Sequence, residues 1–232
     1  MGIRTEPVVW LIIAGLLLGM GWFMIGAGFP AAGDVYFHLR FARDFFNSCV
    51  EKVGYPDWDA RPYDGKGTPA FRFYAPLAYV ITGVFQIFGF PVGFSVKLSI
   101  LLFAFAGAWG TYQWLISLGK SGWAASGGVF PFFVNPIMAL HLFFTFFYQN
   151  LCAMLLFPLV LAGFSRAEKD PTSRNGLCLA VVAMGFVCWT HLPSAMMMGY
   201  GLITIVFFRW LSAFVCLWFC LFVVFMFVVL RI

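Results

Sequence analysis

Asp34 and His38 are the two residues whose types and spacing best suit chemistry in this sequence. Residues four apart lie on one face of a helix, so a helix here would set the carboxylate beside the imidazole. Such a pair can bind a phosphate-bearing lipid or take a proton from a hydroxyl group. Asp34 also stands where that helix would begin, and aspartate is a favoured N-cap residue. Both interpretations, a catalytic carboxylate and a helix cap, are open.

The polar stretch around this pair, residues 33–79, holds most of the ionisable groups that could take part in chemistry. Six of the nine acidic residues of the chain and six of its fourteen lysines and arginines lie here. Among the cations, Arg40, Arg43 and Arg72 are candidates to hold a phosphate group, because guanidinium groups form charge-assisted hydrogen bonds to it. The acidic residues are Asp34, Asp44, Glu51, Asp57, Asp59 and Asp64.

The rest of the chain has the composition of a membrane protein. The whole chain, with the polar stretch included, is 62% hydrophobic and 10% charged, whereas a soluble domain carries about 25% charged residues. Apolar runs long enough to cross a bilayer as helices recur along it. We therefore expect an all-α polytopic membrane protein, one transmembrane domain over 1–232 with about seven to eight membrane segments. The expected segments are about 8–29, 76–91, 97–118, 122–146, 148–165, 177–192, 194–209 and 211–230.

Several other functional classes find no support. There is no run of basic residues typical of nucleic-acid binding, so no nucleic-acid partner is expected. The six cysteines show neither a disulfide framework nor a metal-binding spacing. No metal site is predicted, and the sequence leaves any cofactor unknown. A transporter or channel is disfavoured, because Lys97 and Lys120 are the only charged residues between Ala75 and Ser165.

The residues after Asp34 predict an amphipathic helix over about 35–50. Val35, Leu39, Ala42 and Phe46 recur at intervals of three and four, as one apolar face would. A helix of this kind lies along a membrane surface rather than across it. We expect it to belong to an external loop over 33–75.

Charge and parity together predict the topology. Positive charges in the polar turn 165–176 place that turn in the cytoplasm, and an external 33–75 loop then requires an odd number of crossings between the two. Four apolar segments lie there, and Pro131, Asn135 and Pro136 interrupt 122–146. The favoured solution is that 122–146 enters the membrane in two halves and returns, beside a cavity. Two ordinary helices are the alternative.

Some motifs resemble a known family. The stretch GDVYFHLR, then Pro56 and Trp58, then GKGTPAFRFYAPLAY, is similar to the bacterial membrane proteins labelled "6-pyruvoyl-tetrahydropterin synthase-related". That family resembles the GT-C glycosyltransferases, which use polyprenyl-phosphate-linked sugars and an essential carboxylate in the first external loop. The resemblance implies that Asp34 is that carboxylate, with His38 beside it. It also suggests an N-terminal portion of a longer architecture, in a bacterial inner membrane.

The resemblance implies a transferase that moves a sugar from a polyprenyl-phosphate carrier to an acceptor on the external face. Its expected partners are the lipid-linked donor, membrane lipids and other membrane subunits. The sequence departs from the family pattern at 148–154, where Tyr148, Gln149 and Asn150 stand in place of an expected Arg and Glu. This departure favours the alternative of a non-catalytic membrane subunit that retains the fold. The residues expected to bind substrate are Arg40, Arg43, Arg72, Tyr74 and His191, and His141 is a further candidate to line the cavity.

Overall fold

The computed structural model describes residues 33–51, 58–59, 64–170, 172 and 174–230, with scattered positions between 11 and 29. Most of the expected first helix, and Pro56, Asp57 and Arg61 of the polar loop, lie outside these residues. The described part is helical, apart from an isolated bridge between Asp59 and Thr68. Its helices are α2 (Val35–Val50), α3 (Ala70–Phe73), α4 (Leu77–Ile87), α5 (Val92–Ser117), α6 (Gly122–Phe133), α7 (Pro136–Leu140), the π-helix η1 (His141–Thr145), α8 (Tyr148–Lys169), α9 (Arg174–Thr190) and α10 (Leu192–Leu230).

Three of these helices are long and apolar enough to cross a membrane: α5, α8 and the Leu192–Ser212 part of α10. A fourth crossing results if the bent pair formed by α6 with α7 and η1 counts as one span. Shorter apolar helices are α4 and α9. The chain is therefore a helical membrane protein, as predicted, while the number of seven or eight segments stays a prediction.

The 122–146 segment is broken at Asn135 and Pro136, as predicted, while Pro131 lies inside α6 and does not interrupt it. The side chain of Asn135 caps α7 by accepting a hydrogen bond from the Met138 N–H at 3.0 Å, and Pro136 occupies the first turn. The bend between the two halves is 41°. Gly128 in the first half lies against Leu115 near the end of α5, and Thr145 at the other end accepts a hydrogen bond from Asp34.

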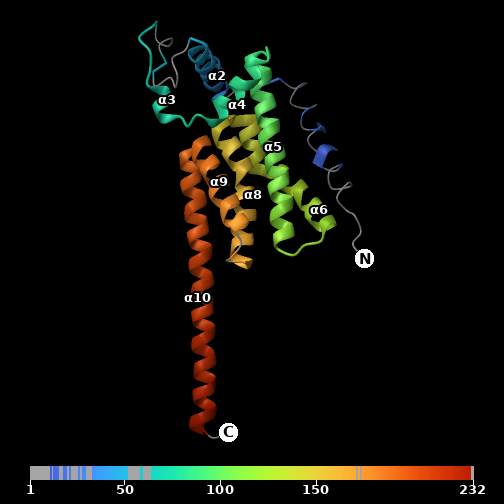
Figure 1. Ribbon diagram of the computed structural model, residues 1–232, viewed down its shortest axis with the longest axis vertical. Coiled ribbons are helices and arrows are strands. Elements are labelled where there is room, and N and C mark those ends of the chain that lie inside the picture. The colour runs from blue at the N-terminus through green and yellow to red at the C-terminus, as the bar shows by residue number, and fades with distance from the viewer. Residues whose placement is uncertain are drawn as a thin grey trace. The chain divides into compact units, whose positions relative to one another are not determined.

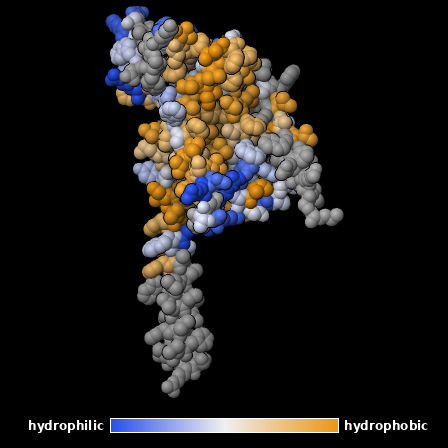
Figure 2. All heavy atoms as spheres, viewed as in Figure 1, coloured by the Kyte–Doolittle hydropathy of each residue, from blue (hydrophilic) through white to orange (hydrophobic). Residues whose placement is uncertain are grey.

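The segment thus connects opposite ends of the bundle, and the prediction that it returns was wrong. The segment too short to cross is α4, whose 11 residues span about 16 Å against a hydrocarbon core of about 30 Å. Three traverses, through α5, α6 to η1, and α8, then separate the polar loop from the 166–174 turn. Figure 2 shows hydrophilic residues at both ends of this unit and hydrophobic residues between them. The two polar segments lie at opposite ends, as predicted.

Close contacts at small residues hold the long helices together. α5 and α8 run parallel, because Ser99 lies near Tyr148 at one end and Arg166 donates to Gln113 at the other. α9 returns along α8 (Figure 1). A methyl group added at Gly163 of α8 would come within 2.3 Å of the Ala180 nitrogen of α9. Such small residues let helix backbones approach in membranes, where van der Waals packing drives association.

The helix predicted over about 35–50 is α2, at the end of the bundle where α4 and the start of α5 lie (Figure 1). Its buried face differs from the predicted one. His38, Phe41 and Asp44 are buried, while Leu39 and Phe46 are only partly so. α2 turns His38 and Phe41 inward because Tyr79 of α4 lies within hydrogen-bonding distance of the first and packs against the second, which a periodicity of apolar residues does not reveal.

The C-terminal part of the chain differs from prediction. The two segments expected at 194–209 and 211–230 form one continuous helix, α10, of 39 residues. No proline or polar turn interrupts this stretch after residue 193, so the backbone hydrogen bonds of the helix continue from one expected segment into the next. The chain divides into two compact units, Met1–Ser194 and Ala195–Ile232, and the candidate site lies in the first.

Candidate functional site

The backbone fixes Asp34 against the end of η1. Gly33 has a φ of +73°, and any side chain there would collide with the Thr145 carbonyl. The Asp34 N–H donates to that same carbonyl at 3.1 Å, and the Asp34 carbonyl accepts from the His38 N–H at 3.0 Å. The first turn of α2 is therefore anchored to η1, which sets the position of the Asp34 side chain.

Asp34 occupies the N-cap position of α2, but its side chain makes no capping hydrogen bond. The residue is half-buried. In the part of the chain that the structure describes, its carboxylate has neither a hydrogen-bond partner nor an ion-pair partner. Capping therefore does not account for this carboxylate, which leaves its oxygens available for a substrate proton.

His38 points from α2 into the protein and is only 4% exposed. Its Nδ1 lies 2.9 Å from the Tyr79 hydroxyl of α4, and its ring meets Tyr74 and Tyr148 edge to face, with centroids 6.2 and 5.7 Å apart. Burial, aided by the charge of His191, lowers the pKa of His38 to about 4. At neutral pH this imidazole is uncharged, so it offers a hydrogen bond rather than a positive charge.

The other two histidines join a hydrogen-bond chain through three further side chains. His141 bonds Thr145 at 3.1 Å and the Asn150 amide at 3.1 Å. Ser194 connects the same amide to His191, with both distances 2.6 Å. The Ser194 backbone N–H also donates to His191 Nδ1 at 3.3 Å, and the Thr145 hydroxyl donates to the Leu140 carbonyl at 3.3 Å, so backbone groups hold both ends of the chain. Burial and the charge of His141 lower the pKa of His191.

All three histidines of the sequence thus gather at one end of the bundle, although 153 residues separate the first from the last (191 − 38). They lie on α2, on η1 and in the α9–α10 connection, and the start of α8 supplies Asn150 between the last two. No group of three His, Cys, Asp or Glu within the described residues is placed to hold a metal ion. The cluster is organised for hydrogen bonding.

The residues at 148–150 that depart from the family pattern are built into the protein interior. The Tyr148 hydroxyl lies 2.7 Å from Thr82 and donates to the Ala78 carbonyl at 3.1 Å. Gln149 donates to the Ala75 carbonyl at 2.6 Å. Asn150 is the middle of the histidine chain. These three side chains therefore join α8 to α4 and to the histidines, in place of a charged pair.

The predicted arginines are distributed differently from the histidines. The Arg40 guanidinium lies over the rings of Phe37 and Phe41, at 5.6 and 5.1 Å from their centroids. Arg43 is 59% exposed on α2, with the Asp44 carboxylate 3.4 Å away, and Arg72 is exposed on α3. The structure brings Asp34, His38, Tyr74 and His191 to one region. It leaves Arg43 and Arg72 on the surface.

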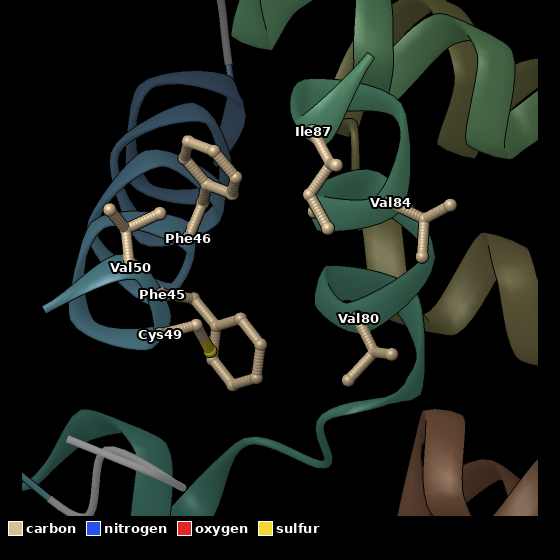
Figure 3. A pocket seen from close by; sticks show the side chains of 8 residues that line it. Phe45, Phe46, Cys49, Val50, Val80, Val84 and Ile87 are labelled. Carbon is tan, nitrogen blue, oxygen red and sulfur yellow. The ribbon is translucent and has the colours of Figure 1, made fainter. Parts of the chain in front are cut away.

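An apolar groove of about 300 Å³ lies between α2 and α4. Neither Asp34 nor His38 lines it, so this groove differs from the cavity expected beside Asp34. Figure 3 shows the side chains of the two helices facing each other across it. The lining residues are Phe45, Phe46, Cys49, Val50, Val80, Gly83, Val84 and Ile87.

No protein-family model, curated protein or solved structure matches this chain.

Sequence reasoning missed three residues of this region: Tyr79, Asn150 and Ser194. Tyr79 stands at the edge of an apolar segment, where an aromatic anchor at the membrane interface is expected, yet it is fully buried against His38. Ser194 follows His191 by three residues at a helix start, a spacing that allows a side chain to turn back and bond. Asn150 had a signal in the sequence too, since an amide in an apolar segment needs a buried partner.

Proposed function

We propose that this protein is a GT-C-like membrane transferase. It moves a sugar from a polyprenyl-phosphate carrier to an acceptor hydroxyl on the face where α2 lies, in a bacterial inner membrane. Asp34 is the general base. The observation that carries the proposal is the half-buried Asp34 carboxylate, which stands at a helix N-cap without capping it. A second support is that Asp34 begins the helix that carries His38, which the Tyr79 hydroxyl holds at 2.9 Å.

In this mechanism Asp34 takes the proton of the acceptor hydroxyl as the sugar transfers. Positioned acid–base catalysis of this kind contributes roughly 10²–10⁴-fold to a rate. His38, neutral and held by Tyr79, orients the acceptor or the sugar by a hydrogen bond. His191, at the end of the chain through Asn150, offers a second such bond.

The carrier phosphate needs a cation, and the available ones lie on the surface of the polar loop. Arg43 and Arg72 are exposed and can reach an anionic group at the membrane interface. Arg40 is engaged with aromatic rings, so it serves this role less well. Tyr74, half-exposed between His38 and the surface, is placed to contact the sugar.

The test replaces Asp34 with asparagine in the full chain, reconstituted in vesicles with radiolabelled polyprenyl-phosphate sugars and hydroxyl acceptors. We expect Asp34→Asn to fold normally and to lose at least about a hundredfold in transfer, because the amide cannot take a proton. Asp64→Asn is the matched control, since Asp64 is exposed in the same loop with a φ of +58° that asparagine also tolerates. Unchanged transfer in Asp34→Asn would exclude Asp34 as the base.

A second candidate is a non-catalytic membrane subunit, and the contacts at 148–150 favour it. Tyr148 and Gln149 donate hydrogen bonds to the Ala78 and Ala75 carbonyls. The start of α8 therefore has a structural role, because it is bonded to the start of α4 and the residues before it. If the wild-type protein neither binds nor turns over any lipid-linked sugar in the same vesicles, the subunit becomes the better assignment. Co-purification of a stoichiometric membrane partner would then be the expected result.

A further inference from the structure

The groove between α2 and α4 is apolar throughout. Aromatic side chains of α2 form one wall and branched aliphatic side chains of α4 form the other (Figure 3). Phe45 forms part of the buried floor, at 5% exposed, while Val50 and Ile87 at the mouth are 64% and 72% exposed. Covering apolar side chains removes them from water, which is favourable. An open apolar groove of this kind therefore suits a hydrocarbon occupant.

The size of the groove selects the kind of hydrocarbon. If a methylene occupies about the volume of a water molecule, roughly 30 Å³, then about 300 Å³ holds on the order of ten methylenes. That is part of one lipid acyl chain. A single turn of a partner helix, roughly 10 Å across and 5.4 Å long, already takes up about 400 Å³, which is more than the groove holds. A long polyprenyl chain would leave most of its length outside.

Arg43 is the cationic side chain on α2 that lies on the same side of the helix as the groove. Arg43 precedes Val50 by seven residues, so both lie on the same side of α2, two turns apart. The Arg43 side chain is 59% exposed, and among the described residues its ion-pair partner is the buried carboxylate of Asp44, at 3.4 Å. A guanidinium next to an apolar groove complements an amphiphile that has a phosphate head and a hydrocarbon tail.

We propose that this groove binds one acyl chain of an anionic membrane phospholipid, whose phosphate is held by Arg43. Neither Asp34 nor His38 lines the groove, and the lipid proposal does not rest on the transferase proposal, although Arg43 is a candidate phosphate ligand in both. Bound lipid would brace α2 against α4, the helix that carries Tyr79.

Gly83 gives a direct way to fill the groove. A methyl group added there would have Phe46 as its nearest neighbour, at 4.0 Å, so Gly83→Ala fits with the groove still open. Gly83→Phe would place a ring in the groove itself. The full chain, purified in mild detergent and exchanged into nanodiscs of phosphatidylglycerol or phosphatidylcholine, is analysed by native mass spectrometry for retained lipid.

We expect wild type and Gly83→Ala to retain one phosphatidylglycerol and Gly83→Phe to lose at least about nine-tenths of it. Arg43→Gln should reduce the preference for phosphatidylglycerol over phosphatidylcholine at least about fivefold. If Gly83→Phe does not fold by circular dichroism, Val80→Phe fills the other end of the groove and replaces it. Equal retention in the filled and open variants overturns the proposal, as does retention of a polyprenyl lipid or of no lipid.

Discussion

The middle of the bundle and its histidine-bearing end are held together by different forces. In the middle, α5, α8 and α9 meet at small residues such as Gly110 and Gly163, where a single added methyl group would collide with backbone atoms. At the end, buried hydroxyl, amide and imidazole groups bond one another, as Tyr148 bonds Thr82 and His38 lies against Tyr79. The middle of the bundle depends on the close fit between helix backbones, and the histidine-bearing end depends on the directions of its hydrogen bonds.

The two kinds of contact have different roles: one maintains the fold, and the other sets the orientation of particular side chains. Close backbone packing supplies many small dispersion contacts and tolerates no added volume. A buried polar network contributes little net free energy for each bond, but it fixes side-chain orientation, because an unsatisfied group is costly. The middle therefore maintains the fold, while the end holds particular side chains in place. Three changes test this contrast, in order of decreasing effect.

The largest effect should come from Gly163→Leu. The new side chain has Ala180 of α9 in its way, so α8 and α9 must separate, and we expect a loss of more than about 3 kcal/mol or no folded protein. Gly185→Leu, on α9 with nothing within 4 Å of its added Cβ, is the control and should fold like wild type. Thermal unfolding in detergent measures both. Equal behaviour would show that the α8–α9 contact does not hold the middle.

The second effect concerns pH at the histidine end. His38 has a pKa of about 4 in the folded protein and about 6.5 when unfolded, so between these values the unfolded state binds more protons. Its contribution is complete above about pH 6.5 and is lost as the pH falls toward 4. The full loss is about 3 kcal/mol, and His191 adds to it with the same sign.

Chemical unfolding of the wild type and of His38→Gln, followed from pH 7.5 to 4.5, measures this loss. The variant removes the titrating group, so its stability should fall less steeply with acid than that of the wild type. Parallel curves for the two proteins would mean that His38 is not held neutral by burial, and the proposed role as an uncharged hydrogen-bonding group would fail with it.

The smallest effect should come from Tyr148→Phe. This change removes one hydroxyl, and Thr82 keeps its bonds to Ser99 at 2.8 Å and to the Ala78 carbonyl at 2.9 Å. We expect a loss of about 1 kcal/mol, the net value of an ordinary hydrogen bond. Tyr200→Phe, at a tyrosine that is 61% exposed, should change nothing. A loss above about 3 kcal/mol would place Tyr148 among the residues that maintain the fold.

Local patterns determined much of the fold. Apolar runs gave the membrane class, and the three-and-four spacing gave α2 with the bounds that the structure has. Asn135 and Pro136 gave the break before α7, because an N-cap residue followed by proline starts a new helix. Whether that broken segment crosses or returns was not determined, since the answer depends on which ends of α5 and α8 it joins.

The site was predictable only in part, because residue types show which side chains are candidates but not which partners they contact. Asp34, His38 and His191 were selected because ionisable groups are rare in an apolar chain and the topology put them at one end. The bond of His38 to Tyr79 depends on how α2 rotates against α4, and the His141–Asn150–Ser194–His191 chain needs three separate elements to meet. Residue types set which groups need partners when buried, but only tertiary packing decided which partners they found, because those contacts join residues that no local period connects.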